Sequence, residues 1–219
     1  MTSQHVDIFY QIVAFLFAIS VHESAHAWMA AKRGDPTAAM LGRITLNPIR
    51  HIDIFGTILL PAIALLSGFP MIGWAKPTPV NPRNFKNLVV DDILTSVAGP
   101  VSNFLVVVFA FLVLAIIGMI ARSTSAVTGE SILTPMAMMF LWLAEINVLL
   151  GVFNLIPLPP LDGSHVLRHA LSGSALRAYD AVGTMGLFVL VFFGARFLDL
   201  LLGPPQQFVV LFSQRLLGF

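Results

Sequence analysis

The sequence predicts an all-α polytopic membrane protein with four or five transmembrane helices, a re-entrant segment and a membrane-associated, proline-rich extended loop. Two observations lead to this fold class. Of the 219 residues, 57% are hydrophobic and 11% are charged, whereas ordinary soluble domains have about 25% charged residues. In addition, five apolar segments approach or reach the roughly 20 residues that a helix needs to cross a bilayer. The apolar excess is therefore expected to face lipid.

The second apolar segment differs from the other four. It is interrupted by Pro61, Gly68 and Pro70, and a proline inside a helix removes a hydrogen bond and clashes with the preceding turn. We therefore expect this segment to enter the membrane and turn back, and the proline-rich residues 73–92 after it to form an extended loop. The five segments are residues 8–31, 54–72, 93–121, 135–156 and 181–202.

The segments belong to one intramembrane domain, residues 1–219, because no internal repeat or linker divides the chain. Its core covers about residues 8–171. Residues 181–219 are expected to form a C-terminal helix followed by a tail that lies at the membrane interface.

Basic residues orient the segments. They are concentrated after the first segment, before the third and after the fourth, so these three stretches are cytoplasmic by the positive-inside rule. Residues 123–134, without Lys or Arg, lie outside. Because basic residues flank residues 54–72 on both sides, this segment cannot make a single crossing. The basic residues are Lys32, Arg33, Arg43, Arg50, Lys76, Arg83, Lys86, Arg168 and Arg177.

The run His22-Glu23-Ser24-Ala25-His26 indicates a metal site near the end of the first segment. Residues four apart project from the same face of a helix, so His22 and His26 can bind one metal ion while Glu23 stands beside it as a carboxylate base. The chain has no cysteine, which leaves His, Asp and Glu as ligands. Such a run also occurs by chance, so its weight comes from its place in a membrane segment and from a matching third ligand.

Asp162 is the best candidate for that third ligand, because a catalytic zinc usually has three protein ligands and an open position. It follows the prolines that end the fourth segment, where a carboxylate is costly without a partner such as a metal ion. The alternative is that Asp162 caps the next helix. His22, His26 and Asp162 reach the same depth only if residues 54–72 are re-entrant, so the metal site and the re-entrant segment depend on each other.

Other polar residues have competing interpretations. His165 and His169 form a second pair four residues apart that could bind a metal ion, but the neighbouring Arg168 favours contact with solvent or lipid headgroups. His51 and Asp53 could support the metal ligands or stabilise a loop.

Several motifs together give the sequence a resemblance to a known family. They are His22-Glu23-x-x-His26, Ala98-Gly99-Pro100 with Asn103, and Asn154-x-x-Pro157 leading to Leu161-Asp162-Gly163, supported by Gly42-Arg43, Leu46-Asn47-Pro48, His51-x-Asp53 and Gly73-Trp74-Ala75-Lys76-Pro77. With these motifs the chain resembles the site-2 protease family of intramembrane zinc metalloproteases, in its short bacterial and archaeal type without a PDZ domain. The resemblance covers about residues 8–171.

The resemblance implies a function and a site. It implies one Zn²⁺ per chain, held by His22, His26 and Asp162, with Glu23 as the general base. It also implies hydrolysis of peptide bonds in or near transmembrane helices of membrane-protein substrates, as in regulated intramembrane proteolysis. The location implied is the cytoplasmic membrane, with the active site toward its cytoplasmic half.

Two asparagine side chains are further candidate site residues. Asn103 and Asn154 lie in apolar surroundings and could bind the substrate backbone or the developing oxyanion.

The expected partners are a transmembrane protein substrate and the lipid bilayer, and a regulatory protein or a second copy of the chain could control substrate selection. The formal net charge of +1 gives no indication of nucleic-acid binding.

A non-enzymatic function is the alternative, either a catalytically inactive relative that binds helices or a metal transporter. Glu23 discriminates between these classes, because a transporter or a pure binder has no need of a carboxylate directly after the first histidine. The sequence therefore favours the protease.

Overall fold

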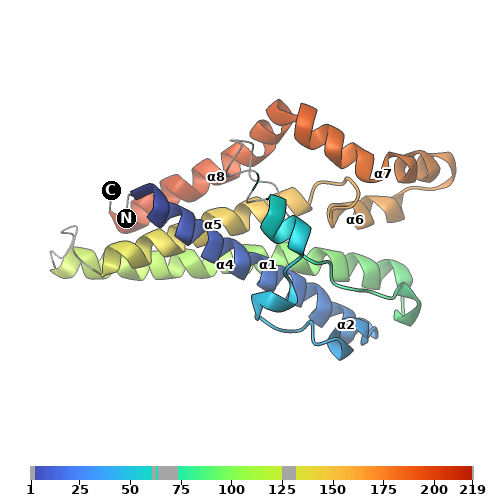
Figure 1. Cartoon of the computed structure of the whole chain (residues 1–219), viewed down its shortest axis with the longest axis horizontal. Helices are drawn as coiled ribbons and strands as arrows, with labels where there is room; N and C mark the ends of the chain where they lie inside the picture. The colour runs from blue at the N-terminus through green and yellow to red at the C-terminus, as the bar shows by residue number, and fades with distance from the viewer. Residues whose placement is uncertain (1–2, 61–62, 64–73, 125–131, 219) are drawn as a thin grey trace. The chain divides into compact units, whose positions relative to one another are not determined.

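Every regular element in the described part of the chain is a helix, which confirms the all-α prediction (Figure 1). The computed structural model describes residues 3–60, 63, 74–124 and 132–218. The helices are α1 (Ser3–Arg33), α2 (Thr37–Met40), α4 (Leu88–Thr124), α5 (Leu133–Asn154), α6 (Gly163–Ala170), α7 (Gly173–Phe193) and α8 (Ala195–Leu217), with the short turns η1 (Pro48–Arg50), η2 (Ile54–Leu59) and η3 (Pro82–Asn84).

Three helices within the described residues are long and apolar enough to cross a membrane: Val6–Arg33 of α1, Leu88–Ser123 of α4, and Leu133–Asn154, the whole of α5. They correspond to the first, third and fourth predicted segments. The chain is therefore an all-α membrane protein, and a fourth or fifth span stays a prediction.

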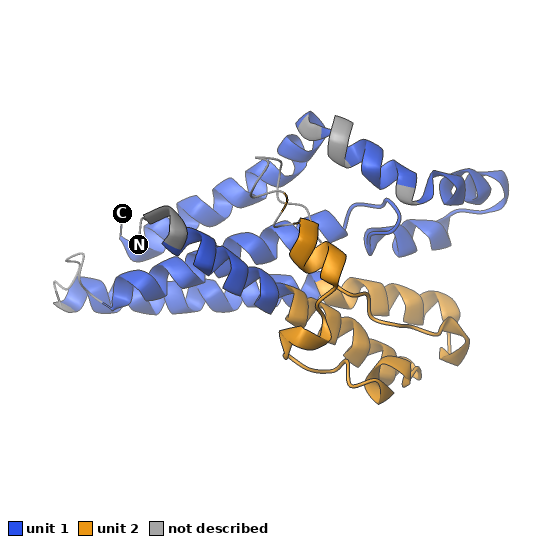
Figure 2. Ribbon diagram, viewed as in Figure 1, with its two compact units in different colours: residues 1–18, 100–219 blue, residues 19–99 orange. Residues whose placement is uncertain are grey.

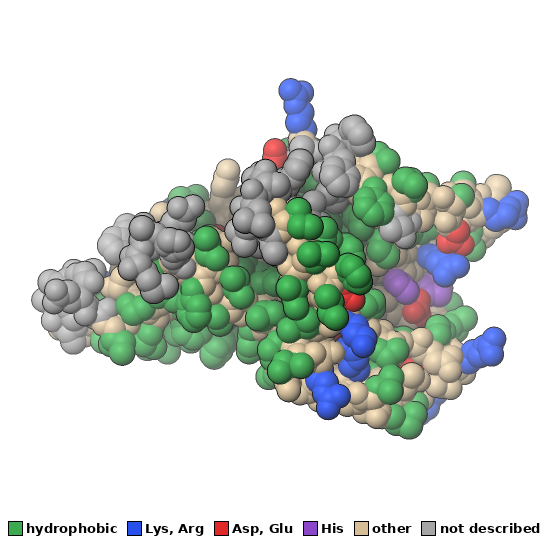
Figure 3. Space-filling model, in the orientation of Figure 1, with side chains coloured by type: hydrophobic (Ala, Val, Ile, Leu, Met, Phe, Trp, Pro, Cys, Tyr) green, Lys and Arg blue, Asp and Glu red, His purple; other side chains and the backbone are tan. Residues whose placement is uncertain are grey.

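The exposed surface of α4 is what a membrane helix requires. Leu105, Phe109 and Leu112, which follow one face of the helix, are each more than half exposed, while Val107 and Ala110 between them are buried. A helix that is apolar on all sides is stable only where lipid covers its outer face. Figure 3 shows hydrophobic side chains gathered on the surface over the long helices.

The chain divides into two compact units (Figure 2). Unit 1 consists of residues 1–18 and 100–219, and unit 2 of residues 19–99. In unit 1, α5 packs along α8, and buried small and aliphatic side chains form the core. This core contains Ala14, Val107, Ala110, Leu143, Ala144, Val148 and Val209.

The C-terminal part of unit 1 differs from the prediction in two ways. Residues 181–202 do not form one helix, because α7 ends at Phe193, Gly194 intervenes and α8 begins at Ala195. The predicted interfacial tail instead forms the second half of α8, where Val209 is fully buried in the core. Phe212 packs edge-on against Phe111 of α4 at a centroid distance of 4.8 Å. Val209 and Phe212 thus pack against other helices, whereas Phe208 and Leu211 are more than half exposed, and a place of this tail at the membrane interface stays a prediction.

Unit 2 is built from the second half of α1, the first turns of α4 and the loops between them. Side chains accept hydrogen bonds at the starts of its short turns: Asn47 from the Ile49 N–H, Asp53 from the Phe55 and Gly56 N–H groups, and Asn81 from the Arg83 N–H. These contacts satisfy backbone donors that a helix start leaves unpaired.

Residues 61–62 and 64–72 of the expected re-entrant segment lie outside the described residues, but its first residues, 54–60, and Trp74 just after it are described. The Trp74 N–H donates to the Gly56 carbonyl at 3.2 Å, and the Thr57 hydroxyl donates to the Trp74 carbonyl at 2.8 Å. A single crossing would separate these ends by about 30 Å of hydrocarbon. The two bonds therefore support a segment that enters and leaves on the same side.

Candidate metal centre

Helix α1 continues through the His-Glu-x-x-His run, so it presents both imidazoles on one face. His22 and His26 are 5% and 7% exposed, and their Nε2 atoms lie 3.0 Å apart. In a tetrahedral site with Zn–N distances of about 2.0–2.1 Å, two nitrogen ligands are about 3.3 Å apart. The two imidazoles thus already have nearly the separation that one zinc ion requires.

A backbone carbonyl orients the second histidine. Nδ1 of His26 lies 2.7 Å from the Thr95 carbonyl oxygen of α4. Because a carbonyl oxygen only accepts, Nδ1 is the protonated nitrogen in this contact, and Nε2 is left as the metal-binding atom. α4 therefore fixes both the tautomer and the ring orientation of His26.

Gly99 allows α4 to come this close. A Cβ atom at Gly99 would lie 2.4 Å from Nε2 of His26 and 2.7 Å from Cε1 of His22. Cβ atoms essentially never come so near other heavy atoms. The glycine of the Ala98-Gly99-Pro100 motif is thus required by its distance to the two imidazoles.

Glu23 is also held by hydrogen bonds within unit 2. The Thr78 N–H and hydroxyl both lie within donating distance of Oε2 of Glu23, at 2.9 Å and 2.7 Å. The same hydroxyl lies 2.9 Å from the Glu23 carbonyl oxygen. The candidate base thus has a fixed partner on residues 74–81, the extended stretch that follows the re-entrant segment.

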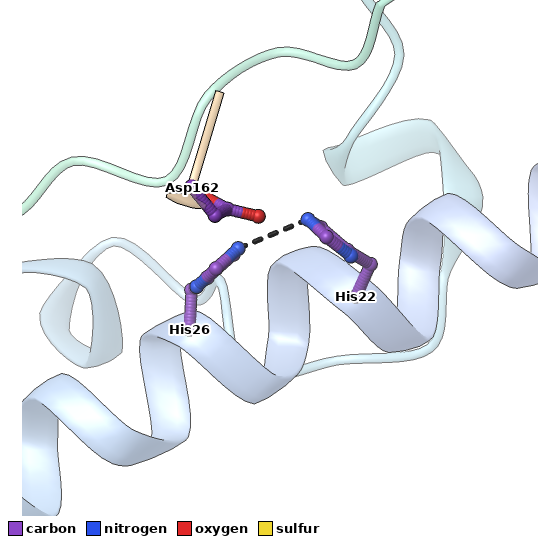
Figure 4. Close-up of side chains that lie close together, drawn as sticks. All are labelled: His22, His26 and Asp162. Atoms are coloured by element: carbon purple, nitrogen blue, oxygen red, sulfur yellow. Dashed lines mark hydrogen bonds between the residues drawn. The ribbon is translucent and has the colours of Figure 1, made fainter. Parts of the chain in front are cut away.

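Asp162 stands at the first position before α6. Its side chain makes no capping hydrogen bond to that helix, so the capping alternative is not supported. One ligand atom each of His22, His26 and Asp162 lies within 4.8 Å of the others, and these three form the group of side chains that could hold a metal ion (Figure 4). The donor set, two imidazoles and a carboxylate, is one that catalytic zinc uses.

A family comparison decides what kind of protein carries this geometry. The model of the family described as "Peptidase family M50" matches residues 10–193. The chain belongs to peptidase family M50. No solved structure matches the chain.

Named relatives agree with the family. The M50 peptidase is 42% identical over 159 residues to the Bacillus subtilis protein named "Putative zinc metalloprotease YwhC", a match that covers 73% of this chain and 68% of that protein. It is 28% identical over 191 residues to the Mycolicibacterium smegmatis protein named "Putative zinc metalloprotease Rip2", covering 85% and 67% of the two chains. The Mycobacterium tuberculosis H37Rv protein of the same name is 29% identical over 192 residues, covering 86% and 68%. The chain is a zinc metalloprotease, and the resemblance to site-2 proteases is confirmed.

The two asparagines of this M50 peptidase lie in different surroundings. Asn103 is fully buried in unit 1, and its amide nitrogen donates to the Ala18 carbonyl at 3.3 Å and to Oδ1 of Asn147 at 2.8 Å. Asn154, at the last position of α5, is half-buried and donates to the Leu150 carbonyl of its own helix at 2.9 Å. Both amide hydrogens of Asn103 are therefore used between helices, whereas Asn154 stands at a helix end.

Some polar residues have a structural role instead. Nε2 of His51 lies 2.8 Å from the Thr45 carbonyl oxygen, and Asp53 begins η2, so both stabilise loops. His165 and His169 lie on α6 and are not part of a group of three metal-ligating side chains within the described residues.

Sequence reasoning missed Thr78 and Thr95. Thr95 contacts His26 through its carbonyl oxygen, which every residue has, so no side-chain pattern could identify it. Thr78 lies 55 positions from Glu23, and its only sequence signal is its place after the Gly73-Trp74-Ala75-Lys76-Pro77 motif.

Proposed function

We propose that this M50 peptidase is an intramembrane zinc endopeptidase that hydrolyses peptide bonds in or near transmembrane helices of membrane-protein substrates, as in regulated intramembrane proteolysis. The observation that carries the proposal is the place of His22, Glu23 and His26 within α1, a helix long and apolar enough to cross a membrane. A hydrolytic site inside such a helix meets peptide bonds that soluble proteases do not reach.

In this proposal His22, His26 and Asp162 hold one Zn²⁺ per chain. When bound there, zinc would act as a Lewis acid that activates water and polarises the scissile carbonyl group. Glu23 takes a proton from the attacking water as general base and returns it to the nitrogen of the leaving amine as general acid. This is the usual role of a carboxylate beside two histidine ligands. The buried imidazoles and the close approach of α4 at Gly99 restrict the water around the site.

The substrate has to unwind locally, because the carbonyl groups of a helix are already hydrogen-bonded. We assign Asn154 to the freed substrate backbone or the developing oxyanion, since it ends α5 in the chain segment that leads to Asp162. The same role for Asn103 requires it to exchange one of its two hydrogen bonds with the substrate. Turnover and stability of variants at Asn103 and Asn154 distinguish a substrate-binding role from a structural one.

The proposed location is the cytoplasmic membrane, with the active site toward its cytoplasmic half. The support is the distribution of Lys and Arg, which places the ends of α1 and α5 nearest the site on the cytoplasmic side. A transmembrane protein is the proposed substrate and lipid the surrounding solvent. A regulatory protein or a second copy of the chain is the proposed source of control.

Cleavage of tagged single-span substrates in reconstituted membranes tests this function. Wild type is compared with Glu23→Gln, and bound zinc is measured in both. Asp180→Asn is the matched control, because it also converts a carboxylate to an amide but at an exposed ion pair with Arg168. We expect cleavage by wild type and Asp180→Asn, and loss of cleavage in Glu23→Gln with zinc retained. Zinc binding by wild type without any cleavage would favour a helix-binding protein or a metal transporter.

A further inference from the structure

Thr78, in the extended residues 74–81, contacts the candidate base Glu23. Two donors of one residue, the N–H and the hydroxyl of Thr78, converge on a single oxygen of Glu23, Oε2. Hydrogen bonds to an ionised carboxylate are stronger than those between neutral groups. Thr78 therefore does more than pack beside the metal site.

Residues 74–81 are themselves held on both sides of Thr78. Before it, the Lys76 N–H donates to the His51 carbonyl at 2.8 Å, and the Trp74 N–H donates to the Gly56 carbonyl. After it, the Asn81 N–H donates to Oδ2 of the fully buried Asp35 at 2.7 Å. Thr78 thus lies in a stretch whose backbone is anchored at both ends, which makes it a rigid support.

A general base has to face its water in a narrow range of orientations. A free Glu side chain has several rotatable bonds, and misplacing a reacting group by about 1 Å can reduce the rate about 100-fold. The Thr78 N–H lies 2.9 Å from Oε2 of Glu23, and the hydroxyl lies closer to Oε2, at 2.7 Å, than to the Glu23 carbonyl oxygen, at 2.9 Å. These contacts leave Oε1 as the oxygen for proton exchange.

We propose that Thr78 is a positioning residue of this M50 peptidase, which holds Oε2 of Glu23 so that Oε1 exchanges the proton with the attacking water. The inference rests on the proposed function, in which Glu23 is the base. It assigns the extended residues 74–81 a part in catalysis through their contact with this carboxylate.

Variants at Thr78 separate its hydroxyl from its shape. Thr78→Val keeps the backbone N–H and the volume but removes the hydroxyl, and Thr78→Ser restores the hydroxyl. We expect Thr78→Val to lower kcat about 10- to 100-fold, with KM and bound zinc unchanged, and Thr78→Ser to keep most of the wild-type kcat. Thr37→Val is the matched control, because it removes another threonine hydroxyl that donates to a carboxylate, at 2.5 Å from Oδ1 of Asp35. Its kcat should stay at the wild-type value.

A second measurement does not depend on activity. In metal-free protein, we compare the loss of Tm caused by Thr78→Val in the wild-type background and in the Glu23→Ala background. We expect a loss of about 2–4 °C with Glu23 present and a clearly smaller loss without its carboxylate. Thr37→Val should lower Tm equally in both backgrounds. If Thr78→Val does not fold, Thr78→Ala replaces it as the variant without a hydroxyl.

The outcomes distinguish this inference from the proposed function. Wild-type kcat in Thr78→Val, or equal losses of Tm in the two backgrounds, overturns the positioning role, while an inactive Glu23→Gln still upholds the protease. Cleavage by Glu23→Gln at the wild-type rate overturns both claims: that Glu23 is the general base and that Thr78 positions it. A fall in kcat that Thr78→Ser reverses, together with unequal losses of Tm, establishes Thr78 as the support of Glu23.

Discussion

Gly99 has only a hydrogen atom as its side chain, which lets α4 lie close to His22 and His26. We expect Gly99→Ala to weaken zinc binding about 10- to 100-fold, the range found when the surroundings of a ligand are disturbed. The added Cβ would lie 2.4 Å from Nε2 of His26, so either the imidazole or α4 has to move. Zinc affinity from titration with a competing chelator measures the effect.

Gly203→Ala is the control for this substitution. A Cβ atom at Gly203, in α8, would meet no atom within 4 Å, and alanine stabilises a helix relative to glycine. Its zinc affinity should equal that of wild type. An unchanged affinity in Gly99→Ala would contradict the close approach of α4 to the two histidines.

The pH dependence of stability should contain a contribution from Asp35. Burial alone would raise its pKa, but hydrogen bonds from Thr37, Asn81 and Asn84 outweigh burial and lower the pKa below the ordinary value of 3.8. A carboxyl group whose pKa is lowered by folding stabilises the folded state above its unfolded pKa. That contribution is lost as the pH falls from about 3.8 through the lower, folded pKa.

Thermal unfolding between pH 7 and pH 3 tests this expectation. The difference in Tm between wild type and Asp35→Asn should be constant above about pH 5 and should shrink below pH 4, because protonation removes the same charge as the substitution. A difference that stays constant down to pH 3 would show that the pKa of Asp35 is not linked to folding in this way.

For individual residues, local sequence patterns predicted the candidate metal ligands and the base, but not the residues that hold them in place. Helical spacing was enough to place His22 and His26 together with Glu23 beside them. The cost of an unpaired carboxylate at an apolar helix end suggested Asp162, and membrane depth agreed with that choice. Thr78 and Thr95 support these residues across 55 and 69 positions of the chain. Such pairs depend on how loops and helices fold together, which no local spacing records.

Among the helices, Asn103 links α4 to α1 and α5 inside unit 1. We expect Asn103→Leu to lower Tm by about 2–4 °C, because hydrogen bonds between membrane helices contribute about 0.6–1.7 kcal/mol each and the amide of Asn147 loses its donor. Specific activity per folded molecule should change little. Thermal unfolding and turnover are measured on the same preparation. Lost turnover with unchanged Tm would instead assign Asn103 to the substrate.

Hydropathy alone did not predict where the C-terminal helices α7 and α8 begin and end. Residues 181–202 are mostly apolar, yet Gly194 ends one helix there. Pro204 and Pro205 lie inside α8, although proline normally breaks a helix. The burial of Val209 and the ring contacts of Phe208 and Phe212 with α4 provide the packing that holds α8 across them. Tertiary packing of this kind overrides local propensity and is invisible in a hydropathy profile.

For the whole molecule, the decisive feature is the path of the chain between α1 and α4. Two sequence observations predict that residues 54–72 turn back: the interrupting prolines and the basic residues on both flanks. The hydrogen bonds that join Gly56 and Thr57 to Trp74 agree with this path. Topology could be inferred from the sequence because charge and hydropathy act over whole segments, and not through individual contacts.

Labelling of single cysteines tests the path, because the chain contains no cysteine to remove. Ile49→Cys, Leu88→Cys and Ser123→Cys are exposed positions that leave the charge unchanged. We expect a membrane-impermeant maleimide to label Ser123→Cys in intact cells, and to label Ile49→Cys and Leu88→Cys only after permeabilisation. α4 is long enough to cross the bilayer, so Leu88 and Ser123 should face opposite sides.

Labelling of Ile49→Cys and Leu88→Cys from opposite sides would mean that residues 54–72 cross the membrane. α4 and α5 would then run in reversed directions, and the end of α5 would carry Asp162 to the face opposite His22 and His26. Zinc would be left with two protein ligands, too few for a catalytic site. Labelling from one side keeps all three ligands at one depth, so the direction of α5, and with it the site, is decided by how residues 54–72 pass through the bilayer.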